Sequence, residues 1–196
     1  EMCIRDRSNS MKTSIVTLLI TFCFYLSVYA QAPQDKATEL KEQALSSLKQ
    51  KDYIKARYLF KKAYEAFAVR ENYPQAIECG IQANALYVRE NFYKEGFELC
   101  RNMEQLIWTG EQKQNKVFYD LRFPISKERL QMYISLKNPA QAKNQLDKLE
   151  EIASLAKNDS LMEVLLYTKA NYYYTFNQNT QGLSLIHISE PTRHSL

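Results

Sequence analysis

Apolar side chains recur along most of the chain at intervals of three or four residues. In the segment KDYIKARYLFKKAYEAF the recurring positions are Tyr53, Ala56, Phe60 and Ala63. Because an α-helix has about 3.6 residues per turn, such positions share one helix face. No useful length of the chain alternates apolar and polar residues as a half-buried strand does. The pattern therefore predicts an all-α protein.

The same helical pattern returns at nearly constant distances. Its small residues are Ala56, Gly96 and Ala142, which lie 40 and 46 residues apart. An independent set, in the preceding helices, has gaps of 40, 46 and 40 residues and consists of Ser47, Tyr87, Tyr133 and Tyr173. Residues three positions earlier repeat these gaps: Ala44, Asn84, Leu130 and Ala170. The agreement predicts repeated helical hairpins, since a single hairpin leaves its apolar face exposed.

Helix-breaking residues are rare, so the predicted helices are long and their connections short. They lie near residues 34–49, 52–70, 74–90, 92–108, 113–136, 139–157 and 159–177. Pro124 directly follows Phe123 and is predicted to kink or split the fifth helix. Trp108, in the segment LIWTG, is predicted to end the fourth helix and to pack against a hairpin turn.

These repeats resemble tetratricopeptide-type repeats, whose second helix has the pattern Tyr-x-x-Ala-x-x-x-Phe-x-x-Ala and whose first helix bears a tyrosine. The resemblance covers roughly residues 36–182 and implies a right-handed α-solenoid of stacked antiparallel helix hairpins, truncated after about three and a half hairpins. The period exceeds the usual ~34 residues, and Ser47, Asn84 and Leu130 depart from the family pattern. The implied packing positions are Tyr53, Ala56, Phe60, Ala63, Tyr87, Tyr93, Gly96, Cys100, Tyr133, Ala142, Leu146, Ala170 and Tyr173.

The two ends of the chain correspond to one inverted DNA element. Back-translation of LSLIHIS with one permitted codon set gives the reverse complement of DNA that encodes EMCIRD in another frame. This DNA resembles the mosaic end of a transposase-based sequencing adapter, and SEPTR resembles the adjoining primer sequence. We therefore expect residues 1–7 and 183–196 to be adapter-derived and residues 8–10 to be upstream read-through. The native product is expected to begin at Met11 and to continue beyond Gly182.

Residues 11–30 are predicted to form a cleaved secretory signal peptide. Lys12 precedes an apolar run from Ile15 to Val28, and small residues follow it, with cleavage expected after Ala30 or alternatively after Ala32. The run has 14 residues, short of the ~20 that a membrane-spanning helix needs. The predicted location of the mature array, residues 31–182, is therefore the bacterial periplasm.

Charge and cysteine content narrow the possible functions of residues 31–182. This stretch has 22 Lys and Arg residues against 19 Asp and Glu residues, interspersed without a basic stripe. Nucleic-acid binding by this fragment is therefore not expected. Its two cysteines, Cys79 and Cys100, could form a disulfide in an oxidising compartment. Two free, buried thiols are the favoured interpretation.

The same stretch contains no histidine, because His187 and His194 lie in the adapter-derived tail. Catalytic arrangements that use histidine and most zinc sites therefore lack their usual residue. No glycine-rich phosphate loop is present either, and the adjacent Glu150 and Glu151 do not face each other on a helix. We expect no catalytic site, metal or cofactor in this fragment.

Partner binding is the favoured function, since stacked hairpins form a concave surface lined by their first helices. The predicted groove is apolar and rich in tyrosine, and an extended peptide or a partner helix would fit it. The family's charged carboxylate clamp is not reproduced. The predicted groove residues are Ile81, Ala85, Val88, Lys127, Gln131, Ile134, Tyr167, Asn171 and Tyr174.

An exported array of this kind resembles the periplasmic sensor region of one class of bacterial membrane-bound regulators. In these, a signal peptide and repeats precede a transmembrane helix, a coiled coil and a histidine kinase or DNA-binding domain. The resemblance implies a sensing array whose full-length protein is membrane-anchored beyond residue 182. The alternatives are a freestanding periplasmic scaffold for the assembly of envelope complexes, or an exported enzyme with a histidine-bearing domain downstream.

Overall fold

The computed structural model describes residues 36–176, which form seven helices and no strand. The all-α prediction is thus confirmed for this part of the chain. The expected adapter-derived ends and the signal peptide lie outside the described residues. The first helix covers residues 36–49, and the others are α2 (Tyr53–Val69), α3 (Tyr73–Arg89), α4 (Tyr93–Gln114), α5 (Tyr119–Ser135), α6 (Pro139–Ala156) and α7 (Asp159–Thr175).

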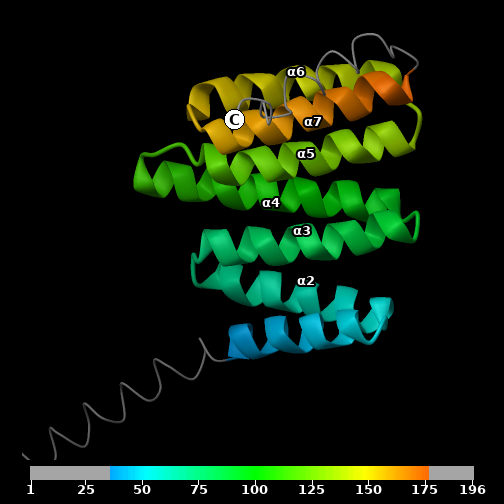
Figure 1. Ribbon diagram of the computed structural model, residues 1–196. Helices are drawn as coiled ribbons and strands as arrows, with labels where there is room; N and C mark the ends of the chain where they lie inside the picture. The colour runs from blue at the N-terminus through cyan, green and yellow to red at the C-terminus, as the bar shows by residue number, and fades with distance from the viewer. Residues whose placement is uncertain (1–35, 177–196) are drawn as a thin grey trace, which may run out of the picture.

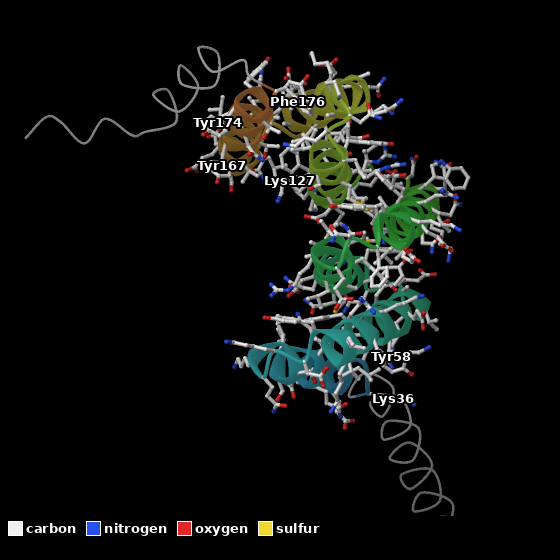
Figure 2. The ribbon with its side chains drawn as sticks, turned by 90° about the vertical axis from the view of Figure 1, so that its right-hand side faces the viewer. Lys36, Tyr58, Lys127, Tyr167, Tyr174 and Phe176 are labelled. Atoms are coloured by element: carbon white, nitrogen blue, oxygen red, sulfur yellow. The ribbon has the colours of Figure 1, made fainter. Side chains whose placement is uncertain are left out.

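The helices lie antiparallel, and those up to α5 follow one another in chain order, whereas α7 turns back to lie beside both α5 and α6 (Figure 1). Each helix from α2 to α6 packs against the next one, and α5 also contacts both α3 and α7. Among α2, α4 and α6 the mutual contacts are marginal. The perpendicular view shows the reason, because α3, α5 and α7 lie toward one side of the stack and α4 and α6 toward the other (Figure 2).

Four of the six turns between helices share one hydrogen-bonding pattern. In the first turn, the N–H of Asp52 donates to the Ser47 carbonyl at 3.0 Å and the N–H of Lys51 donates to the Leu48 carbonyl at 3.0 Å. This is a Schellman motif, in which the last carbonyls of one helix find partners just beyond its end. Asp52 also begins α2, and its carboxylate accepts a hydrogen bond from the N–H of Lys55 at 3.1 Å. A single residue thus completes one helix and caps the next.

The same pattern recurs after α2, α3 and α5. In each of these turns a backbone N–H donates to the carbonyl five residues earlier, as Asp52 does to Ser47. The bonds run from Asn72 to Phe67, from Phe92 to Tyr87 and from Asn138 to Tyr133, at 2.9 to 3.1 Å. Three of these acceptors, Ser47, Tyr87 and Tyr133, belong to the regularly spaced set, and the fourth, Phe67, does not. Every one of the six turns between helices has a residue with positive φ: Lys51, Glu71, Asn91, Asn115, Lys137 and Lys157.

Buried side chains form two clusters, and α5 belongs to both. Ile125 and Met132 of α5 join the cluster that extends back to the helix at residues 36–49. Phe123 and Leu130 join a second cluster with α6 and α7. Of the implied packing positions, the small and aliphatic ones are buried, whereas Tyr53, Tyr87, Tyr93, Tyr133 and Tyr173 are half-buried at the edges of these clusters.

The predicted end of the fourth helix at Trp108 is wrong, and of the two alternatives for Pro124, a kink or a split of the fifth helix, the split does not occur. Trp108 does not end a helix, because α4 continues to Gln114. Gly110 is buried in the helix interior, where an added Cβ would lie 2.6 Å from the Tyr73 ring. It therefore permits a close approach between α3 and α4 and is no C-terminal signal. Pro124 lies inside α5 without splitting it.

Cys79 and Cys100 are buried and form no disulfide with each other, in agreement with the favoured interpretation. Burial raises the pKa of the Cys79 thiol to about 11 and that of the Cys100 thiol to about 12. Because the thiolate is the reactive form, neither group is suited to nucleophilic or redox chemistry in the folded protein.

The strained turn residues predict that Lys51→Gly stabilises the protein. Lys51 is exposed with φ at 62°, and a non-glycine residue there costs about 1–2 kcal/mol. Glycine removes this cost but is more flexible in the unfolded chain, by about 0.5–1 kcal/mol. Urea titration should show a net gain of about 0.5 kcal/mol in the free energy of unfolding.

Lys61→Gly is the matched control, since Lys61 is also exposed but lies in the middle of α2. This substitution should lower the free energy of unfolding by about 1 kcal/mol. Equal losses from both substitutions would contradict the assignment of a left-handed turn to Lys51.

Candidate functional site

The predicted groove residues belong to α3, α5 and α7, which form one side of the stack. We call this side the α3/α5/α7 face. Figure 2 shows Lys127, Tyr167 and Tyr174 on this side, away from Tyr58 of α2. The Asn171 amide donates to Gln131 Oε1 at 3.5 Å and so links α7 to α5 across the face. The structure therefore brings the α5 and α7 members of the predicted set together.

The nine predicted residues differ in their exposure. Tyr167 and Tyr174 are the most exposed, at 74% and 73%. They lie seven residues apart, so both rings project from the same stripe of α7. Ile134 is only 4% exposed and packs in the second cluster, so its assignment to the groove is wrong. The others are exposed (Ala85, Gln131) or half-buried (Ile81, Val88, Lys127, Asn171).

A buried polar pair lies between α3 and α5. Asn84 is fully buried, and its Nδ2 donates to Glu128 Oε2 at 3.1 Å, whereas its Oδ1 accepts no hydrogen bond. Burial raises the pKa of Glu128, although the Asn84 hydrogen bond and the nearby Lys127 charge oppose this rise. Lys127 Nζ lies 4.0 Å from Glu128 Oε1. This pair explains why asparagine replaces the usual small residue at position 84: its amide binds the buried carboxylate.

Glu111 joins the end of α4 to the start of α5. Its carboxylate accepts hydrogen bonds from the Phe118 N–H at 2.8 Å and from Arg122 Nε at 2.7 Å, and Arg122 Nη2 completes a two-pronged pair. Phe118 begins α5 and has no side chain that could cap it. The carboxylate of Glu111 therefore satisfies a helix-start donor that the local sequence leaves open.

A cavity that the sequence analysis missed lies between α4, α5 and α6. Its volume is about 450 Å³, within the range of small-molecule sites. Trp108 of α4 and Leu155 of α6 line it, as do Arg122 and Arg129 of α5. No residue of α3 or α7 contributes, so the cavity lies apart from the α3/α5/α7 face. The sequence offered one signal, a tryptophan on a helix face that would otherwise be polar.

Metal and membrane sites were also sought among residues 36–176. In this range no three His, Cys, Asp or Glu side chains are grouped so that they could hold a metal ion. None of the described helices combines the length and the apolar character needed to cross a bilayer.

The Glu111–Arg122 pair predicts a specific pH dependence of stability. Burial alone would raise the pKa of Glu111, but hydrogen bonds from Arg122 and the Phe118 N–H, with the Arg122 charge, lower it overall. A carboxylate with a lowered pKa in the folded state stabilises the protein above its unfolded pKa, and this contribution is lost as the pH falls through the folded value. Glu111→Gln should therefore cost about 2 kcal/mol at pH 7 and progressively less below about pH 4.

The measurement is urea unfolding of both proteins at several pH values. Glu98→Gln is the control, because Glu98 is exposed on α4 and forms no ion pair with the described residues. It should change the free energy of unfolding by less than about 0.5 kcal/mol. A loss at Glu111 that stays constant from neutral to acid pH would contradict the role of its charge.

The chain was compared with models of protein families, with curated proteins and with solved structures. No family model, no curated protein and no solved structure matches it.

Proposed function

We propose that residues 31–182 are a non-catalytic tetratricopeptide-type array that binds a segment of a partner protein. In this proposal the hairpins form a right-handed solenoid, and its concave side is the α3/α5/α7 face. Support comes from the turns, because three of the Schellman bonds have Ser47, Tyr87 and Tyr133 as acceptors, and these residues belong to the regularly spaced set. The direct contacts of α5 with α3 and α7, against the marginal contacts among α2, α4 and α6, also favour curvature toward this face.

The observation that carries the binding proposal is the exposure of Tyr167 and Tyr174 on one stripe of α7. Two large aromatic rings exposed on one stripe of a helix form an apolar surface of the kind that marks interaction sites. Tyrosine offers a large contact area and a hydroxyl group at a low cost in side-chain entropy. Gln131 and Asn171 beside the rings can hydrogen-bond the backbone of an extended peptide or the side chains of a partner helix.

We also propose that the array works in the bacterial periplasm as the sensing part of a larger regulator that is membrane-anchored beyond residue 182. The signal-peptide pattern of residues 11–30 supports export, and the regulator rests on resemblance to such sensor regions. A freestanding periplasmic scaffold for envelope complexes is the alternative. Both functions use the same face, so they differ in what the full-length protein contains and not in the surface that binds.

The binding proposal predicts the effect of removing the two rings. Peptide ligands can be selected with the protein from a random-peptide library and their affinities measured by fluorescence anisotropy. Tyr167→Ser combined with Tyr174→Ser should weaken binding at least about tenfold, as expected for exposed aromatic residues at the centre of an interface.

Tyr58→Ser provides the matched control, because Tyr58 is 60% exposed and lies on the opposite side of the stack. It should leave the affinity unchanged. Peptides whose binding depends on Tyr58 and not on the α7 rings would contradict the proposal.

The membrane-anchored regulator and the freestanding scaffold predict different coding sequences beyond codon 182. Amplification from the source sample past codon 182 should give an uninterrupted frame that runs into an apolar helix of about 20 residues, followed by a kinase or DNA-binding domain. An early stop after a polar capping helix would favour the freestanding scaffold. If LSLIHIS persists in independently prepared DNA, the interpretation of both ends is wrong.

A further inference from the structure

The cavity between α4, α5 and α6 has the features of a ligand site. Its inner wall is apolar, since Ile107 and Ile125 are almost completely buried beneath it. Trp108 and Leu155 are 53% and 51% exposed, so each presents an uncovered apolar surface from α4 and α6. The two exposed side chains can therefore enclose an apolar group between the helices.

The same cavity contains a buried donor that lacks a partner. Arg129 lines the cavity, and its Nε is buried with no hydrogen-bond partner among residues 36–176. Gln145 and Ser126 also line it and are only 6% and 8% exposed. An unsatisfied buried polar group costs about 1–3 kcal/mol, and native proteins contain few of them. The unpaired Nε–H of Arg129, with the largely buried donors of Gln145 and Ser126 around the same cavity, points to a bound acceptor.

The cationic groups of the cavity are held in place before any ligand binds. Glu104 accepts two hydrogen bonds from Arg129 Nη1, at 2.6 and 2.7 Å. These bonds fix the guanidinium while its Nε–H remains available. Arg122 is held by Glu111 on the same wall. Such preorganisation lowers the entropy cost of binding an anion.

We propose that this cavity binds a small amphipathic carboxylate. Its apolar body, aromatic or branched aliphatic, lies between Trp108 and Leu155. Its carboxylate accepts hydrogen bonds from Arg129 Nε, the Gln145 amide and the Ser126 hydroxyl. The cavity is too small for a helix, and three cationic side chains line it (Arg122, Arg129 and Lys148) against two carboxylates (Glu104 and Glu151), so a small anion fits better than a peptide segment or a neutral hydrocarbon. This site is independent of the α3/α5/α7 face.

Trp108 reports on this cavity directly, because it is the only tryptophan in the chain. The full chain is titrated with 4-phenylbutyrate and 4-methylvalerate, and then with 4-phenylbutanol and 4-methylpentanol. Tryptophan fluorescence follows occupancy of the site, and calorimetry measures the affinity. At least one acid should bind saturably with a change in Trp108 emission, and its alcohol should bind at least about tenfold more weakly, since it leaves the buried donors poorly satisfied.

Two substitutions at α6 test the polar contacts. Gln145→Leu removes the buried amide at similar size and should weaken binding of the acid about tenfold, without weakening the alcohol. Gln141→Leu is the control, because Gln141 lies one turn earlier on α6 with an exposed side chain outside the cavity. It should leave both affinities unchanged. Circular dichroism confirms that each variant is folded.

Three results would overturn the proposal. The first is that neither acid binds at millimolar concentration. The second is that acid and alcohol bind equally, and the third is that binding of the acid survives Gln145→Leu. Since Tyr167 and Tyr174 lie elsewhere, their substitution should not affect this titration, so its failure and the failure of the proposed function can be told apart.

Discussion

The stack depends on small residues that allow a large side chain of the next helix to approach closely. An added Cβ at Gly96 of α4 would lie 2.9 Å from the Met132 sulfur of α5 and 3.0 Å from the Asn84 amide oxygen of α3. At Gly80 the corresponding atom would lie 2.4 Å from the Met103 sulfur. The spacing between layers is therefore set by side-chain volume, and each bulky residue needs its small counterpart. This constraint gives the repeat its register.

The region around α4 and α5 departs from that regular arrangement. The left-handed turn residues Lys51, Glu71 and Asn91 follow one another at 20 residues, but the next two intervals are longer because α4 has 22 residues and its connection to α5 is extended. Glu111 takes part twice there, because its carbonyl accepts a hydrogen bond from the Lys116 N–H at 3.3 Å and its carboxylate bonds to Phe118 and Arg122 across the connection. The cavity beside Trp108 lies in the same region.

Local signals in the sequence predicted most of the helices to within one or two residues at each end. Turn chemistry explains this success, because Asp52, Asn72 and Asn138 each cap a helix that starts directly after them. The end of the fourth helix was predicted too early, because α4 continues past Trp108 to Gln114 and Gly110 contacts Tyr73 of another helix. The burial of Ile134 and the presence of the cavity could not be predicted, because each depends on how α5 and α6 pack. Helical periodicity does not specify that packing. The exposure of Tyr167 and Tyr174 could be predicted, because it follows from their positions within the repeat alone.

The membership of α5 in both core clusters makes it the helix that joins the two halves of the described chain. Its Ile125 and Met132 pack with the helices before it, and its Phe123 and Leu130 pack with those after it. The cavity lies on one side of α5 and the exposed rings of α7 lie on the other. Any tilt of α5 would therefore alter both surfaces at once.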